Sequence, residues 1–238
     1  MGMRSCAYYD AFERPKIVYQ EIQYHSNFAI DRAGRLGNNK TFLLTTNGPE
    51  ILVALNSPIM LWHNWRYLPH MKDGALTPVA FKMEALPLPQ FDDAARASAA
   101  DLSNQASAAQ RLVREAERAM LDWLRQGRGI KRPVGALASA SGLDLDGFVT
   151  AVRSSLPKKT KVTAADIAEL RREHAATIEP ARRARGEIFA LERQLSELVN
   201  EVHGLTPDEV DLMWRTAPPT NAVHAGWASG GQGRAQCG

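Results

Sequence analysis

Five side chains suited to contact with nucleic acid fall within residues 32–40. They are Arg32, Arg35, Asn38, Asn39 and Lys40. An arginine can form two hydrogen bonds with guanine, an asparagine can do the same with adenine, and a lysine commonly meets a phosphate. The same residue types are also typical of an ordinary solvated loop, so both interpretations stay open.

Other positive side chains could add contacts to the phosphate backbone. Lys16 and Arg66 are secondary candidates. Residues 128–161 carry seven lysines and arginines against two aspartates, a net charge of +5. Such a segment suits diffuse, salt-dependent contact with phosphate, and its candidates are Lys158, Lys159 and Lys161. A solvated basic surface is the alternative interpretation.

No pattern in the sequence predicts a catalytic or metal centre. The six histidines are scattered, and none is spaced from another histidine or a cysteine as metal ligands are. Gly230-Gly231-Gln232-Gly233 resembles part of a glycine-rich cofactor loop, but no strand is predicted before it and no helix after it. We therefore expect no catalytic, cofactor-binding or metal-binding residue in this chain.

The composition is that of an ordinary globular protein. The 238 residues suffice for one large domain or two small ones, with 45% hydrophobic residues, 23% charged residues and a net charge of +3. Two cysteines, Cys6 and Cys237, do not make a disulfide framework. No apolar run approaches the roughly 18 residues of a membrane span. We expect a cytoplasmic protein without a membrane partner.

The segments on either side of the polar loop favour strands. Residues 17–19, 28–30 and 41–46 are rich in β-branched and aromatic residues. Residues 31–40 contain two glycines and two asparagines, which tolerate turn geometry. An exposed loop between two strands would present the five candidate side chains from a rigid sheet.

Short helices complete the N-terminal section. Residues 50–55 should form one helix that is closed by Asn56, because proline at 58 disfavours helical geometry just before it. Residues 59–70 should form a second. Its aromatic residues, Trp62, Trp65 and Tyr67, could stack on bases, but their spacing among apolar residues favours packing in the core.

The rest of the chain is predicted to be almost wholly helical. One helix is expected over 92–126 with Gly127 just beyond it, followed by two short helical stretches around 133–140 and 144–155. A long helix should begin with Thr163 and Asp166 as a capping box, bend at Pro180 and end at Gly204. Thr206-Pro207-Asp208-Glu209 should begin the last helix.

Apolar residues of the long helix recur at intervals of three and four, which is typical of a seam between paired helices. The stripe comprises Ile167, Leu170, His174, Ile178, Ala181, Arg185, Ile188, Leu191, Leu195, Leu198 and Val202. We expect this helix to pack antiparallel against 92–126, with Leu191 and Leu195 in the core. The predicted fold is α+β, with a β-rich module over 1–90, a helical region with a long antiparallel helix pair over 91–219, and a disordered tail over 220–238.

The order of several short motifs resembles the target-recognition domain of adenine-specific DNA methyltransferases. PKIVYQEI is followed by KTFLLTT, ILVALNSPIM, an aromatic stretch and MEALPLP. LERQLSELVNEVHGLTPDEVDLMWRTAPP is similar to the helical ending of the same enzymes. The resemblance is closest to the large type II and type IIG restriction–modification enzymes and extends over residues 12–219. It implies double-stranded DNA as a partner and S-adenosylmethionine as the cofactor of the full-length enzyme.

Two motifs of that family are missing. The chain has neither the glycine-containing loop that binds S-adenosylmethionine nor the Asn/Asp-Pro-Pro-Tyr/Phe motif that holds the flipped adenine. We therefore interpret the chain as the recognition and scaffold part of a larger enzyme, inactive alone, whose partner is the missing catalytic portion or subunit. Two alternatives stay open: a specificity subunit that acts in trans with a complete methyltransferase, and a structural helical interaction protein.

Overall fold

The computed structural model describes residues 9–72, 74–131, 133, 135–157, 160 and 162–218. The chain divides into two compact units. The first unit combines Met1–Ser103 with Arg193–Gly238, and the second is Asn104–Glu192. Two long helices, α5 (Asp93–Arg128) and α9 (Glu179–Val202), each run from one unit into the other. This division differs from the boundary predicted at residue 90.

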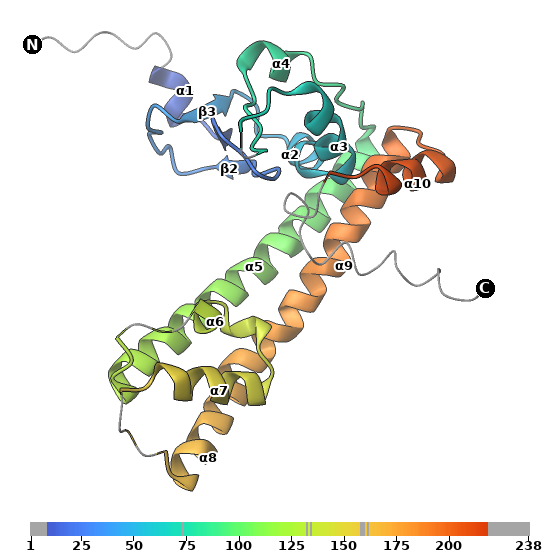
Figure 1. Cartoon of the computed structure of the whole chain (residues 1–238). Coiled ribbons are helices and arrows are strands. Elements are labelled where there is room, and N and C mark those ends of the chain that lie inside the picture. Colours follow the sequence, from blue (N-terminus) through green and yellow to red (C-terminus); the bar gives the residue numbers. More distant parts are fainter. Residues whose placement is uncertain are drawn as a thin grey trace, which may run out of the picture. The chain divides into compact units, whose positions relative to one another are not determined.

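A three-stranded antiparallel sheet forms the centre of the first unit, just after a short helix, α1 (Tyr9–Glu13). The strands are β1 (Lys16–Gln20), β2 (Ala29–Asp31) and β3 (Thr41–Leu44), with β1 in the middle. Tyr19 lies 5.3 Å from Phe28 and 5.5 Å from Phe42, measured between ring centroids. The aromatic and β-branched residues that predicted the strands thus also form their core, and the α+β fold class is confirmed (Figure 1).

Asn56-Ser57-Pro58 separates two helices, α2 (Pro49–Asn56) and α3 (Pro58–Tyr67), as predicted. The Ser57 hydroxyl caps α3 by accepting a hydrogen bond from the Met60 amide at 3.3 Å. The Asn56 side chain exchanges two hydrogen bonds of 3.0 Å with the backbone of Phe28. Because Phe28 immediately precedes the edge strand β2, Asn56 satisfies backbone groups that have no neighbouring strand.

A second apolar cluster joins α2 to the ends of the two long helices in the first unit. It contains Val53, Ala54, Phe91, Ala99 and Val199, all buried. Ala99 lies in the first turns of α5 and Val199 in the last turn of α9, so the two helices run antiparallel here. The ends of both helices therefore belong with the sheet, because they share its unit's apolar core. A further short helix, α4 (Ala80–Glu84), precedes them.

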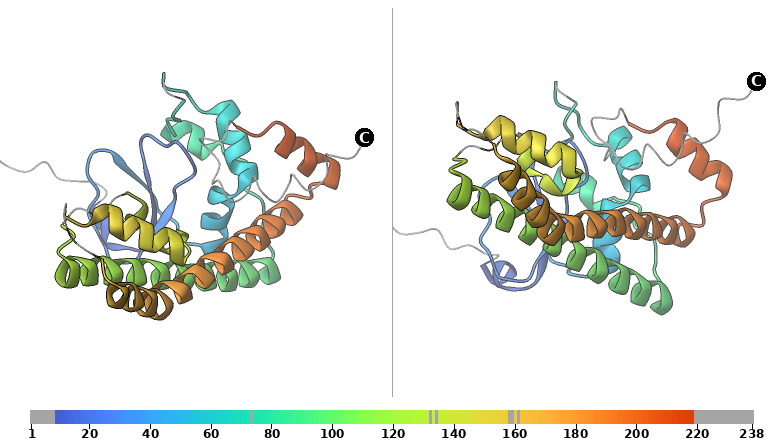
Figure 2. Two further views of the ribbon diagram at one scale, coloured as in Figure 1. Left: turned by 60° about the horizontal axis from the view of Figure 1, so that its bottom comes forward. Right: turned by 90° about the horizontal axis from the view of Figure 1, so that it is seen from below.

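The second unit is wholly helical in its described part. Between α5 and α9 lie α6 (Gly135–Ala138), a 3₁₀ turn (Ala140–Gly142), α7 (Leu145–Ser155) and α8 (Ala164–Glu173). Their shared core includes Met120, Leu137, Phe148, Leu170 and Ile178. Figure 2 shows α7 lying against α5 and α8 in both of its views. The two short predicted helical stretches and the long helix after Thr163 are confirmed.

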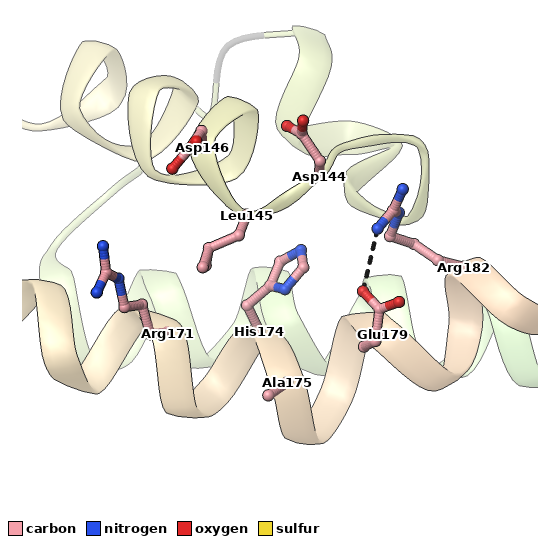
Figure 3. Close-up of a pocket in the computed structure, with 8 residues that line it drawn as sticks. All are labelled: Asp144, Leu145, Asp146, Arg171, His174, Ala175, Glu179 and Arg182. Carbon is pink, nitrogen blue, oxygen red and sulfur yellow. Dashed lines mark hydrogen bonds and ion pairs between the residues drawn. The ribbon is translucent and has the colours of Figure 1, made fainter.

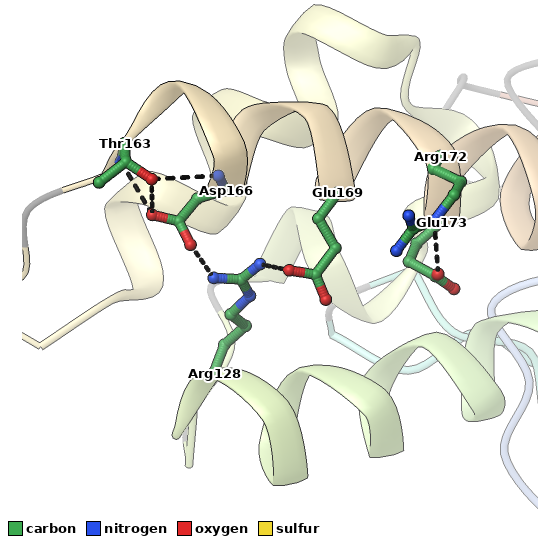
Figure 4. A network of polar contacts seen from close by, with 6 residues as sticks. All are labelled: Arg128, Thr163, Asp166, Glu169, Arg172 and Glu173. Carbon is green, nitrogen blue, oxygen red and sulfur yellow. Dashed lines mark hydrogen bonds and ion pairs between the residues drawn. The ribbon is translucent and has the colours of Figure 1, made fainter.

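Helix α5 continues beyond its predicted end at residue 126 and stops at Arg128, before Gly129, whose φ is +64°. The Arg128 guanidinium forms ion pairs with Asp166 and Glu169 on α8 (Figure 4). Asp166 also closes the predicted capping box with Thr163. The hydrogen bonds from Thr163, followed by that from Arg128, hold the pKa of Asp166 well below its usual range.

A π-helical turn (His174–Ile178) stands between α8 and α9, directly before Pro180. We predicted a kink at Pro180 because its ring would collide with the carbonyl four residues earlier. The wider π turn supplies room for the ring, and the Glu179 amide bonds instead to the His174 carbonyl. His174, Ile178 and Ala181 are buried as the stripe predicted.

The second half of the stripe is less buried than predicted. Leu191 and Leu195 are only partly covered, whereas Ser196 and Val199 are buried. The expectation of a core position is therefore wrong for Leu191, whereas Leu195 is partly buried and packs against the cluster that contains Val53 and Val199. The helix ends at Gly204 as predicted, because its φ of +70° allows the Leu205 amide to turn back and bond the Asn200 carbonyl at 3.0 Å.

The last described helix, α10 (Pro207–Arg215), begins with the predicted capping box between Thr206 and Glu209. Pro207 occupies its first turn, where no amide hydrogen is needed. None of the helices in the described residues is long and apolar enough to cross a membrane. Residues 220–238, predicted to be a disordered tail, lie outside the described residues.

Candidate nucleic-acid interface

The base of the 32–40 loop is a buried ion pair. The register of β1 and β2 sets Lys16 opposite Asp31, and the Lys16 Nζ atom lies 2.7 Å from Asp31 Oδ2. The side chains are only 2% and 8% exposed. Lys16 Nζ also donates to the Phe12 carbonyl at 2.6 Å. The pair thus connects α1, the sheet and the start of the loop.

Asp31 in turn holds the first turn of the loop. Its Oδ1 atom accepts a hydrogen bond of 3.0 Å from the Ala33 amide, and its Oδ2 atom accepts one of 2.8 Å from the Arg35 amide. Between them Gly34 has a φ of +65°, which a residue with a side chain rarely adopts. The hydrogen bond from Lys16, then that from Ala33, lower the pKa of Asp31 to about 2.

These contacts correct the interpretation of Lys16 as a DNA contact. Its ammonium group is buried and already bonded to Asp31 and Phe12, so it cannot reach a phosphate. The error arose because the sequence shows the charge of Lys16 but not its partner on the neighbouring strand. Lys16 instead positions the loop.

The far end of the loop is fixed by Asn38. Its Oδ1 atom accepts hydrogen bonds of 3.0 Å from the Lys40 amide and from the Thr41 hydroxyl. An asparagine needs its oxygen as well as its amide nitrogen for a two-bond contact with adenine. A two-bond contact by Asn38 would therefore compete with the turn that it stabilises.

The remaining loop candidates are exposed. Arg32, Arg35 and Asn39 present their side chains to solvent, and Lys40 forms an exposed ion pair with Glu21. Leu36, which sequence reasoning did not select, is 68% exposed. An exposed leucine beside two arginines suits apolar contact with a thymine methyl group. Together with Asn38, these five side chains lie on one short segment between β2 and β3.

Arg66 lies elsewhere in the first unit, on α3. Its guanidinium donates to the Trp62 carbonyl at 2.8 Å and to the Thr216 carbonyl at 2.7 Å. Tyr67 is 58% exposed, and Trp62 and Trp65 are only partly buried, so the expectation that these aromatic residues pack in the core is wrong for Tyr67 and is not met in full by the two tryptophans. Lys158, Lys159 and Lys161 lie outside the described residues. Arg128, counted in the basic segment, is engaged by two carboxylates.

A pocket of about 490 Å³ opens in the second unit beside the π turn (Figure 3). Charged side chains of both signs surround it, together with a histidine and two apolar residues. The lining is Asp144, Leu145, Asp146, Arg171, His174, Ala175, Glu179 and Arg182. Sequence reasoning selected none of these as a site.

Several polar groups of this pocket have structural partners. His174 is 3% exposed, and its Nε2 atom lies 3.3 Å from the Leu143 carbonyl. Asp144 caps α7 by accepting from the Gly147 amide at 2.8 Å, and Glu179 pairs with Arg182 at 3.1 Å. No group of three histidine, cysteine, aspartate or glutamate side chains in the described residues is arranged to hold a metal ion. We assign no chemistry to this pocket.

Comparison with known proteins gives one match. A family model described as a domain of unknown function, DUF8810, matches residues 92–199. No curated protein and no solved structure matches the chain. The matched range begins just before α5 and ends within the last turn of α9, so it comprises the second unit and the adjoining helix ends but not the 32–40 loop.

Proposed function

We propose that this chain recognises DNA sequence and provides a helical scaffold for a site-specific adenine DNA methyltransferase of a restriction–modification system. The catalytic and S-adenosylmethionine-binding motifs would come from a separate portion or subunit. The order of the sequence motifs supports this proposal. A cytoplasmic setting is part of it, because the DNA to be modified lies there.

The observation that carries the proposal is the construction of the 32–40 loop. Its two ends are held by hydrogen bonds that the Asp31 and Asn38 side chains accept, while Arg32 and Arg35 remain exposed between them. A segment that reads bases needs exposed donors on a backbone that does not have to be ordered on binding. The buried Lys16–Asp31 pair supplies that order before any DNA is bound.

Binding selection from a random pool of duplex DNA tests the proposal. The full chain should enrich a preferred sequence, and Arg35→Ala should relax that preference at one position, at a cost of about 1–3 kcal/mol per lost base contact. Arg118→Ala is the matched control, since it removes an exposed arginine from α5 in the second unit. If Arg35→Ala and Arg32→Ala both select the parent sequence with parent affinity, the loop does not read DNA.

A second candidate function is helical interaction with another protein. Leu112 on α5 and Phe189 on α9 are 43% and 42% exposed within the second unit, although both are large and apolar. Sedimentation velocity on the full chain would test this candidate. Self-association that Leu112→Ser and Phe189→Ser abolish, without any DNA selection, would favour it over sequence recognition.

A further inference from the structure

The outward face of α3 carries two pairs of planar side chains. Met60 and Asn64 occupy the buried face of this helix. Two residues further along from each, Trp62 and Arg66 lie on the opposite side, with the Arg66 guanidinium carbon 3.9 Å from the centre of the Trp62 ring. His63 and Tyr67 stack beside them, with ring centroids 4.5 Å apart and planes inclined by 25°.

This face is held in place by the chain after α10. The Trp62 indole donates to the Thr216 hydroxyl at 2.9 Å, and Arg66 donates to the Thr216 carbonyl at 2.7 Å. Trp62 and Arg66 are thereby fixed, and Arg66 stays exposed. Tyr67, which stacks on His63, is 58% exposed. A rigid aromatic group loses little conformational entropy when another ring stacks on it.

The segment that contains α3 has a positive net charge in the sequence. From Pro58 to Met83 the sequence has one carboxylate, Asp73, against Arg66, Lys72 and Lys82. Exposed aromatic rings beside an arginine match a polyanion whose units carry planar rings. An acidic peptide without aromatic residues would use the positive charge but not the stacked rings.

We propose that this face of α3 binds single-stranded DNA, with an unpaired base stacked on Tyr67 and the Arg66 guanidinium beside the DNA backbone. The arrangement on α3 is independent of the 32–40 loop, and only the choice of DNA over RNA rests on the proposed function. Tyr67 contributes the stacking surface, which His63 supports from the other side of the ring. Arg66 contributes positive charge while its hydrogen bonds keep it beside Trp62.

Fluorescence anisotropy with the full chain tests this proposal. The probes are a labelled oligothymidylate, an abasic strand of equal length and charge, the matching oligouridylate, and a duplex. The parent should bind oligothymidylate more tightly than the abasic strand. Tyr67→Ala should weaken binding of oligothymidylate about 5-fold to about 100-fold, and Tyr67→Phe should retain it, because a lost stacked base costs on that scale.

Phe81→Ala is the matched control, because Phe81 is a 66% exposed aromatic residue of the same unit outside α3. It should bind like the parent. The proposal is overturned if Tyr67→Ala, with parent-like circular dichroism, binds oligothymidylate as the parent does. It is also overturned if the parent binds the abasic strand or the duplex equally well, and the assignment to DNA is overturned if oligouridylate binds more tightly. The Arg35→Ala variant is tested with duplex DNA and the Tyr67→Ala variant with single-stranded DNA, so either proposal can be rejected without the other.

Discussion

Lys16 and Asp31 face each other across the first two strands, and their side chains form a buried ion pair with a separation of 2.7 Å. The same carboxylate accepts the amides of Ala33 and Arg35, so the conformation of the loop depends on a charge inside the sheet. The buried Lys16–Asp31 pair thus fixes the backbone of the solvent-exposed 32–40 loop.

Replacing Asp31 by Asn should reduce the loss of unfolding free energy that the protein shows at acid pH. The folded pKa of Asp31 is about 2, below its ordinary 3.8, so the ionised carboxylate stabilises the folded state above about pH 4. That contribution is lost as the pH falls from about 4 to about 2. Denaturant unfolding between pH 2 and pH 6 should show a steeper fall for the parent than for Asp31→Asn. Asp211→Asn, which breaks an exposed pair with Arg215, should follow the parent.

The lysines at the two ends of the loop region should differ in their effect on stability. Lys16→Met leaves the buried Asp31 carboxylate without its cation and should cost about 3–5 kcal/mol of unfolding free energy. Lys40→Met breaks a pair in which the lysine is 61% exposed, and its cost should stay within about 0.5 kcal/mol. Hydrogen exchange of the Arg35 amide should accelerate only in Lys16→Met. Equal losses for both variants would contradict the positioning role of Lys16.

Burial along the long helix predicts unequal costs for two leucines in the second unit. Leu170 is 2% exposed in the shared core, so Leu170→Ala should cost about 2–5 kcal/mol. Leu191 is only partly buried, and Leu191→Ala should cost about 1 kcal/mol or less. Thermal or urea unfolding of the two variants measures the difference. A larger loss at Leu191 would show that the stripe continues into a core as its spacing predicts.

The capping box of α10 predicts a small and specific loss. The Thr206 hydroxyl accepts the Glu209 amide, so Thr206→Ala should cost about 0.5–2 kcal/mol, whereas Thr206→Ser should be nearly neutral. Because Thr216 ends this helix and bonds Trp62, fraying of α10 should also change the tryptophan fluorescence. An unchanged unfolding midpoint in Thr206→Ala would mean that α10 contributes nothing to global stability.

Local features of the sequence determined most of the secondary structure. The three strands, the stop at Asn56-Ser57-Pro58, the capping boxes at Thr163 and Thr206, and the helix end at Gly204 were all predicted. Each depends on interactions between residues a few positions apart, so the spacing of residue types in the sequence is enough to predict it. The exposed arginines of the 32–40 loop were predicted for the same reason, because glycine and asparagine mark the turn.

Tertiary structure decided which of these side chains are available for binding. Lys16 is buried because strand pairing sets it opposite a residue 15 positions away, and Asn56 finds its partner 28 positions away. Tyr67 is exposed although its neighbours on α3 favoured a core, since only packing determines which side of a helix is covered. The sequence shows which residues are charged and which are aromatic. The three-dimensional fold decides whether a charge is neutralised beneath the surface and whether a ring is presented on it.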